Sequence, residues 1–420
     1  MGAKIASVTA REIFAARNNL CLEVTVTTDT GAVGVSTPEA GVSTGRYEAA
    51  FVLDGGERYD GMGQRKAAAN VNDVIGPALK GIDVTKQAEI DAAMIALDGT
   101  PDKSRLGANA MVGVSLAAVK AAANSEQTPL YRYIGGFVAC VVPIPILGIG
   151  TGGRYRDPGN SRWYKPSYEF CPYGAGSYAL SMEWGHDLKK TLNSILRQRY
   201  GYAVQGGRGL NLASVLKDDR ELLDAMTQAI AKCGLEDKCG IYFDAAAGCY
   251  YENDIDRYVG IFSESTRTRD EMIQLYKGMV RDFPIVSIED PLDEEDFEGH
   301  GMVTAELGIE IVGDDLFTTN AKRVQMGYEH KAANSMVLKI TQVGTVSEAM
   351  DAVRLCRQYG YNVHPCGSRG DLDSLVDFAV GLNAGQARGF DGNRLLKIEE
   401  ELGVAARWLG RAAYNRGPVR

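Results

Sequence analysis

The chain contains 420 residues, of which 45% are hydrophobic and 24% are charged. This balance is typical of a folded globular protein with one or two domains and excludes a largely disordered chain. The formal charge of −9 and the lack of a basic stripe argue against a nucleic-acid-binding surface. We find no run of about 18 apolar residues and no signal-peptide core, so we expect a cytoplasmic protein without membrane contact.

The first part of the chain combines strand and helix signals. Residues 4–14, 20–31 and 32–41 are rich in Thr and Val and are separated by turn residues, which predicts a small antiparallel meander. Ala-rich segments with helical periodicity follow at residues 63–81, 85–99 and 109–124. We therefore predict an N-terminal α+β capping domain over residues 1–137.

The pattern changes after residue 137. Short apolar runs now alternate with helical segments, as is typical of buried parallel strands. The clearest runs occupy residues 241–247, 284–290, 309–315, 335–340 and 361–365. A (β/α)8 barrel typically needs about 250 residues. Residues 138–420 are sufficient, so we predict a barrel of this type that carries the metal and catalytic site.

Polar residues at the ends of these strands recur at one spacing. Glu289, Asp314, Lys339 and His364 lie 25 residues apart, and each comes at or near the end of an apolar run. The C-terminal ends of parallel barrel strands meet at one rim, so these side chains are expected to converge. Asp244 ends the preceding strand after a longer connection.

The strand-end acids predict a divalent metal site. Asp244, Glu289 and Asp314 supply hard oxygen ligands suited to Mg²⁺. Alternatively, such acids cap the helices that follow them. Lys339 beside a metal is a candidate base, because its environment can favour the neutral amine. Its alternative role is a salt bridge to one of the acids.

Several longer segments resemble the enolase family, in the family's order and over nearly the whole chain. They read LGANAMVGVSLAAVKAAA, PLYRYIGG, PIVSIEDPL, VGDDLFTTN, LKITQVGT, VGLNAGQ and LLKIEEELG. The resemblance implies an N-terminal α+β domain on an atypical barrel, a homodimer or larger homo-oligomer, and a lysine that removes an α-proton while divalent metal stabilises the product.

The matching motifs also carry over individual roles. The metal positions fall on Asp244, Glu289 and Asp314, and the base falls on Lys339. Two further positions are implied by the resemblance: Glu169 matches an active-site glutamate, and Ser43 matches a mobile-loop serine that joins a second metal.

Two loops depart from the family pattern. The segment AVQGGRGLN, which contains Arg208, replaces a GDEGG loop whose glutamate helps the β-hydroxyl leave. The family's GGAHA loop is replaced by a segment without histidine that contains Arg154, Arg156, Arg162 and Lys165. These changes make the site more positive, which suits a larger or more anionic ligand, unless the loop cations are only surface residues.

Two further segments are altered. The family's SHRSG motif appears as CGSRG, with Gly367 in place of the histidine and with Ser368 and Arg369 in exchanged order. The second active-site lysine has no match in GQARGFDGNRLLKIEEELG, where Lys397 matches a structural arginine.

The pattern of loss and gain most resembles carboxyphosphonoenolpyruvate synthase of phosphonate antibiotic pathways, which we predict as the function. The enzyme would act on a phosphoglycerate or enolpyruvate unit, with small anionic phosphates or phosphonates as its other partners. Their predicted contacts are Ser43, Arg154, Arg156, Arg208, Ser368 and Arg369. The alternatives are phosphopyruvate hydratase, which dehydrates 2-phosphoglycerate, and a non-catalytic enolase paralog.

Two residues near the site have open roles. His364 is a candidate acid/base, or a residue that hydrogen-bonds behind the metal ligands. Cys366 is expected to be a passive thiol, since nothing nearby marks a nucleophile.

Overall fold

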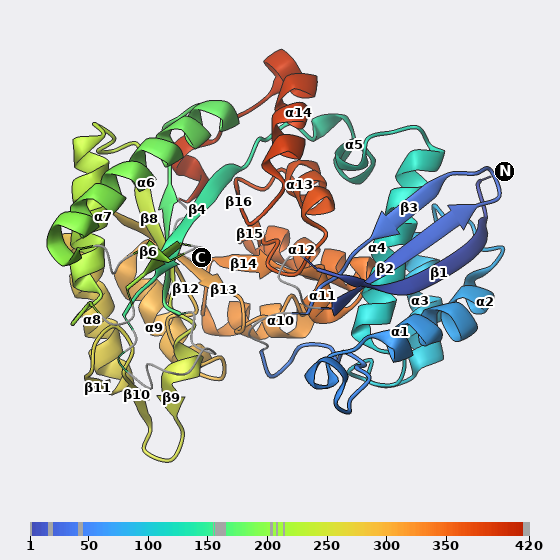
Figure 1. The fold of residues 1–420 in the computed structure, drawn as a ribbon, viewed down its shortest axis with the longest axis horizontal. Helices are drawn as coiled ribbons and strands as arrows, with labels where there is room; N and C mark the ends of the chain where they lie inside the picture. Colours follow the sequence, from blue (N-terminus) through green and yellow to red (C-terminus); the bar gives the residue numbers. More distant parts are fainter. Residues whose placement is uncertain are drawn as a thin grey trace.

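The computed structural model describes residues 2–15, 20–40, 45–153, 155, 165–201, 205–206, 209–212 and 215–414. For residues 205–206, 209–211 and 373 it describes the backbone alone. Figure 1 shows the N-terminal segment, in blue and cyan, packed beside a barrel formed by the rest of the chain.

The N-terminal part is an α+β unit. Strands β1 (Ile5–Phe14), β2 (Leu20–Thr28) and β3 (Val33–Ser36) form an antiparallel sheet in chain order, as predicted. Helix α4 (Ala108–Ser125) packs on β2 and β3 and is buried along most of its length. A Cβ on Gly34 would lie 2.0 Å from the Ala117 carbonyl oxygen, so glycine permits this close approach.

Other helical segments complete this unit. The segment predicted at residues 63–81 is helical, with a π-helical middle turn. The helices and turns are η1 (Arg58–Gly61), α1 (Arg65–Ala69), η2 (Asn70–Ile75), α2 (Gly76–Leu79), α3 (Gln87–Asp98), α5 (Leu130–Gly135) and η3 (Gly136–Val138).

Eight strands form the barrel. Around it the order is β16, β4, β5, β8, β12, β13, β14 and β15, and a parallel bridge between Cys366 and Arg388 joins the two ends. The predicted parallel strands pair in parallel, whereas β5 runs antiparallel to both neighbours. The bounds are β4 (Ile144–Thr151), β5 (Ser167–Cys171), β8 (Gly240–Asp244), β12 (Ile285–Glu289), β13 (Glu310–Gly313), β14 (Ser335–Leu338), β15 (Asn362–Pro365) and β16 (Gln386–Arg388).

The strands are buried on both faces, which explains their continuous apolar sequences. In β8, Ile241 and Phe243 belong to the large core beneath the outer helices, whereas Tyr242 belongs to a separate cluster with Val312 and Val337. Since successive side chains point to opposite faces of a strand, this second cluster fills the barrel interior. The predicted architecture, an N-terminal α+β domain followed by a (β/α)8-type barrel, is confirmed.

Helices surround the barrel (Figure 1). They are α6 (Tyr178–Tyr200), α7 (Arg220–Lys232), α8 (Arg269–Asp282), α9 (Phe297–Leu307), α10 (Ala321–His330), α11 (Ile340–Val343), α12 (Val346–Tyr359), α13 (Leu372–Gly381) and α14 (Gly392–Leu402). Shorter elements are β6 (Gln205–Gly206), β7 (Gly209–Asn211), η5 (Ala247–Tyr250), β9 (Tyr251–Glu252), β10 (Arg257–Val259), β11 (Thr266–Arg267), η6 (Gly403–Ala405) and η7 (Gly410–Ala413).

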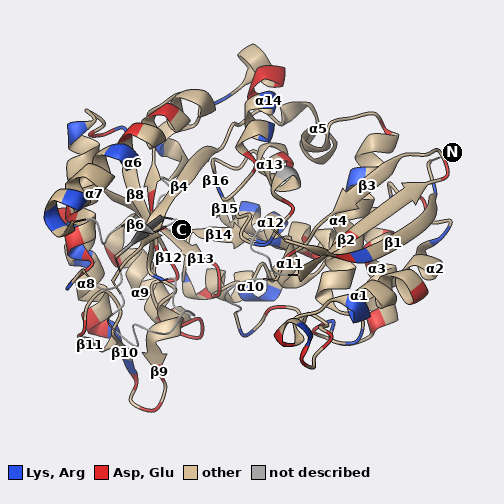
Figure 2. Ribbon diagram, in the orientation of Figure 1, with Lys and Arg blue, Asp and Glu red and all other residues tan. Residues whose placement is uncertain are grey.

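Figure 2 shows acidic and basic residues interspersed along the outer helices. Among the described residues, no helix has the length and apolar character needed to cross a lipid bilayer.

Candidate active site at the C-terminal ends of the barrel strands

The strand register brings the predicted site residues to one rim of the barrel. Glu289, the last residue of β12, pairs with Asp244 of β8 on one side and with Val312 of β13 on the other. Asp314 directly follows β13, and Lys339 directly follows β14. The equal spacing in the sequence therefore corresponds to neighbouring positions in space.

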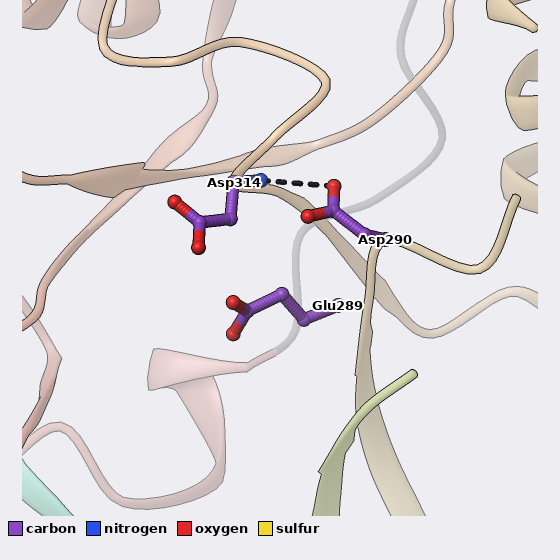
Figure 3. A group of neighbouring side chains, drawn as sticks. All are labelled: Glu289, Asp290 and Asp314. Carbon is purple, nitrogen blue, oxygen red and sulfur yellow. Dashed lines mark hydrogen bonds between the residues drawn. The ribbon is translucent and has the colours of Figure 1, made fainter. Parts of the chain in front are cut away.

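Three buried carboxylates gather here, as Figure 3 shows. Glu289, Asp290 and Asp314 each place one carboxylate oxygen within 4.8 Å of the others. Asp290 was not predicted. Its oxygens accept the backbone amides of Asp314, at 3.0 Å, and Asp315, at 2.8 Å. We infer that Asp290 mainly holds the turn after β13, which leaves Glu289 and Asp314 better placed to bind a cation.

The third predicted ligand, Asp244, lies outside that group. Its side chain is buried and forms ion pairs with Lys165 and, at 3.5 Å, with Arg388. Neither carboxylate oxygen accepts a hydrogen bond from a described residue. Oδ2 is nevertheless paired with Lys165, so a hard divalent cation would have to replace that ion pair, whereas Oδ1 has no hydrogen-bond partner among the described residues. Asp244, Glu289 and Asp314 thus fit Mg²⁺ in chemistry, and their role as its ligands stays a prediction.

The ammonium group of Lys339 is paired with a carboxylate. Lys339 is buried, and its Nζ donates to Oδ2 of Asp314. Burial alone would lower the pKa of Lys339, but the neighbouring negative charges, that of Asp314 first, together outweigh burial and raise it. Without a metal, Asp314 stabilises the proton on Lys339, as in the alternative salt-bridge role, and the role of Lys339 as a base beside a metal stays a prediction.

A guanidinium group from β16 lies among the acids. Nη2 of Arg388 is 2.9 Å from Glu289 and 3.5 Å from Asp244, and Nη1 is 3.6 Å from Glu169. The guanidinium also lies 5.3 Å from the centre of the Tyr242 ring. Burial alone would raise the pKa of Glu289, but the neighbouring positive charges, Arg388 first and then Lys165 and Lys339, together outweigh burial and hold that pKa well below its ordinary value.

Glu169 reaches the same rim from β5. It is buried, and its Oε2 accepts no hydrogen bond from a described residue. Burial raises the pKa of Glu169 to about 7, although the positive charges of Arg388 and Lys165 oppose the shift. A carboxyl group with such a pKa can donate or accept a proton near neutral pH.

Comparison with known proteins identifies the family. The sequence matches the family model described as the enolase N-terminal domain over residues 5–134, and the one described as the enolase C-terminal TIM barrel domain over residues 139–416. The chain belongs to the enolase family.

Proteins named enolase are similar to this chain over nearly their whole length. The protein from Methanocaldococcus jannaschii is 42% identical over 415 residues, which is 96% of each chain. The one from Thermococcus gammatolerans is 42% identical over 98% of each chain, and the one from Pyrococcus furiosus is 41% identical over 97% of each. The enolase resemblance is thus confirmed. These relatives do not support the finer resemblance to carboxyphosphonoenolpyruvate synthase, and homo-oligomerisation stays a prediction.

Besides Asp290, sequence reasoning missed Arg388. It belongs to the segment in which the family carries its second active-site lysine, where the motif comparison selects only Lys397. The sequence signal was weak, because the strand that ends at Arg388 is the short segment QAR and contains no apolar run.

His364 lies deeper than expected. It is the third residue of β15, is fully buried, and meets Tyr242 edge to face with ring centroids 5.4 Å apart. Burial and then the charge of Arg388 lower the pKa of His364 to about 3, so the ring is neutral. Neither ring nitrogen has a hydrogen-bond partner among the described residues. Neither predicted role, acid/base or hydrogen bonding, therefore finds support here, and both stay predictions.

The CGSRG segment leaves no room for a side chain where the family motif has its histidine. A Cβ on Gly367 would lie 1.7 Å from the carbonyl oxygen of Gly389, so no side chain fits there. Arg369 is buried, and its guanidinium binds both oxygens of Glu48. Its predicted contact with substrate would therefore compete with Glu48. Ser368 lies beside it and is half-buried.

Four of the predicted substrate contacts lie outside the described residues. These are Ser43, Arg154, Arg156 and Arg208. Of the four cations predicted in the loop after β4, Lys165 is described, and it pairs with Asp244.

Proposed function

We propose that this protein catalyses the reversible dehydration of 2-phosphoglycerate to phosphoenolpyruvate with Mg²⁺. The observation that carries the proposal is the Lys339 and Asp314 pair at the same rim as Glu289 and Asp244. Relatives named enolase, similar over nearly the whole chain, support it.

The reaction begins with proton removal. Mg²⁺ supplies the positive charge that makes a proton next to a carboxylate acidic. Asp244, Glu289 and Asp314 would hold it. Lys339 takes the proton from C2, and for this it must first be neutral. An Asp314 carboxylate that holds Mg²⁺ would attract the ammonium less strongly and would so favour the neutral form of Lys339.

The second step is loss of the C3 hydroxyl. A double bond forms between C2 and C3 while the C–O bond breaks, and the hydroxyl needs a proton to leave as water. Glu169, with a pKa of about 7 and a free Oε2 among the described residues, is suited to donate it. It would take over from the glutamate of the GDEGG loop, which this sequence lacks.

The test uses purified protein with Mg²⁺ and 2-phosphoglycerate, followed for phosphoenolpyruvate and for exchange of the C2 proton in D2O. Formation of phosphoenolpyruvate would support the proposal. Exchange of the C2 proton without formation of phosphoenolpyruvate would support Lys339 as the base. It would also show that Glu169 alone does not supply the proton that the leaving hydroxyl needs. Absence of both, in protein that binds Mg²⁺, would reject the function.

Formation of carboxyphosphonoenolpyruvate, predicted first from the sequence, remains the second candidate. The favouring observation is the tight contact of Gly367 with Gly389, which excludes a side chain where the family carries a histidine. The site would then be rebuilt for another reaction rather than merely weakened. Its test repeats the assay with cytidylyl-activated phosphonoformate and follows release of the cytidine nucleotide. No turnover in either assay would favour the non-catalytic paralog.

A further inference from the structure

One side chain of the N-terminal domain, Glu48, is connected to the candidate active site by hydrogen bonds through a single residue. Glu48 has a side chain that is 6% exposed, and its carboxylate accepts the backbone amide of Gly45 at 3.0 Å and both terminal nitrogens of Arg369. The cation neutralises a carboxylate that would otherwise be buried without a partner. Arg369 thereby holds Glu48 in one orientation, facing the barrel.

The intermediary is Gln342 in α11. Its Nε2 donates to Oδ1 of Asp314 at 2.9 Å and to Oε1 of Glu48 at 3.4 Å. Its Oε1 accepts the hydroxyl of Thr319 at 2.9 Å, and its backbone carbonyl accepts the amide of Ala49 at 2.8 Å. Both ends of the amide are therefore engaged, so Gln342 cannot turn without breaking contacts to either domain.

This series of contacts ends at Asp314, which also contacts the predicted base, Lys339. Its Oδ1 is held by Gln342 and its Oδ2 by the ammonium of Lys339. The backbone amide of Lys339 in turn donates to Thr319 at 3.0 Å. A rotation of the Asp314 carboxylate would thus move both the predicted metal ligand and the partner of the base.

We propose that Glu48, acting through Gln342, is a positioning residue that fixes the Asp314 carboxylate beside Lys339. Proton removal in the barrel thereby depends on docking of the N-terminal domain. The inference rests on the proposed function for its kinetic consequence. It does not require Glu48 to touch the substrate.

The test compares Glu48→Ala, Glu48→Gln, Gln342→Leu and the double variant E48A/Q342L. Rates of C2 proton exchange in D2O and Mg²⁺ affinity by isothermal titration are both measured. Lys103→Met is the control, because Lys103 joins the same two domains through a 2.9 Å ion pair with Glu348 that does not involve Asp314. It should lower thermal stability and leave kcat unchanged.

We expect E48A and Q342L each to reduce kcat for exchange about tenfold or more, with a smaller change in KM, because they misplace reacting groups. Glu48→Gln keeps an acceptor for Gln342 but leaves Arg369 without its charge partner, so it should recover part of the rate lost in E48A. The double variant should be no slower than the slower single variant, since both act on Asp314. Independent, multiplying effects, or an equal kcat loss in K103M, would overturn the proposal.

Measurement of Mg²⁺ binding tests the positioning role of Glu48 separately from the proposed function. If the wild-type protein shows no exchange, the proposed function fails, and the positioning role is then decided by titration alone. E48A and Q342L should bind Mg²⁺ more weakly than wild type, whereas K103M should not. Equal affinities in all variants would refute the positioning role whatever the reaction is.

Discussion

Removal of Arg388 tests how the charges of the site are balanced. Its guanidinium lies 2.9 Å from Glu289, 3.5 Å from Asp244 and 3.6 Å from Glu169, and the side chain is 14% exposed. Arg388→Met keeps much of the side-chain volume but leaves these buried carboxylates short of a cation. Breaking a buried pair in this way costs about 3 to 5 kcal/mol. We expect a loss of this size in the free energy of unfolding without metal.

Added Mg²⁺ should recover part of the loss, because it supplies positive charge to the same carboxylates. At a concentration 100 times its Kd, a ligand stabilises the folded state by about 2.7 kcal/mol. The assay is urea unfolding in EDTA and in saturating Mg²⁺, for wild type and for R388M. We expect Mg²⁺ to stabilise the variant more than the wild type, since the cation no longer competes with Arg388.

The matched control is Arg394→Met. Arg394 pairs with Asp377 at 2.6 Å and has a side chain that is 21% exposed. Its loss should destabilise the protein equally in EDTA and in Mg²⁺. If R388M were as stable as wild type in EDTA, or gained no more from Mg²⁺ than R394M, the balance of charge described for the site would be wrong.

Three further changes address the base, a buried acid and the turn after β13. Lys339→Met should slow C2 proton exchange by about 10² to 10⁴-fold, as measured by NMR in D2O, and an active variant would reject Lys339 as the base. Burial raises the pKa of Asp219 to about 7, so the contribution of this group to stability should fall as pH rises from about 4 to 7, where the unfolded chain has already released that proton. Thermal unfolding of Asp219→Asn should show a flatter pH dependence, and equal slopes would contradict this. Asp290→Ala should cost about 1 to 3 kcal/mol by leaving the amides of Asp314 and Asp315 unsatisfied, whereas Asp290→Asn should lose less; similar urea midpoints for the two variants would refute its role in the turn.

The sequence predicted those residues of the candidate site that recur at a constant spacing along the chain. Each barrel unit repeats strand and helix, so residues at equivalent strand ends return to one rim, and equal spacing was enough to select Glu289, Asp314 and Lys339. The direction of His364 was harder to predict. Which residue of a short strand is the last one, and how deep its side chain lies, depends on register with neighbouring strands.

The sequence by itself determined the family, the two-part architecture and the residue types available for metal and proton chemistry, because these depend on local periodicity and motif order. Only the tertiary structure decided the partners of those residues. Arg388 meets Glu289 across 99 positions of the chain, and Arg369 meets Glu48 across 321. Such pairings depend on how strands and domains pack, and burial then sets the strength of each electrostatic interaction. Neither can be predicted from the spacing of residues along the chain.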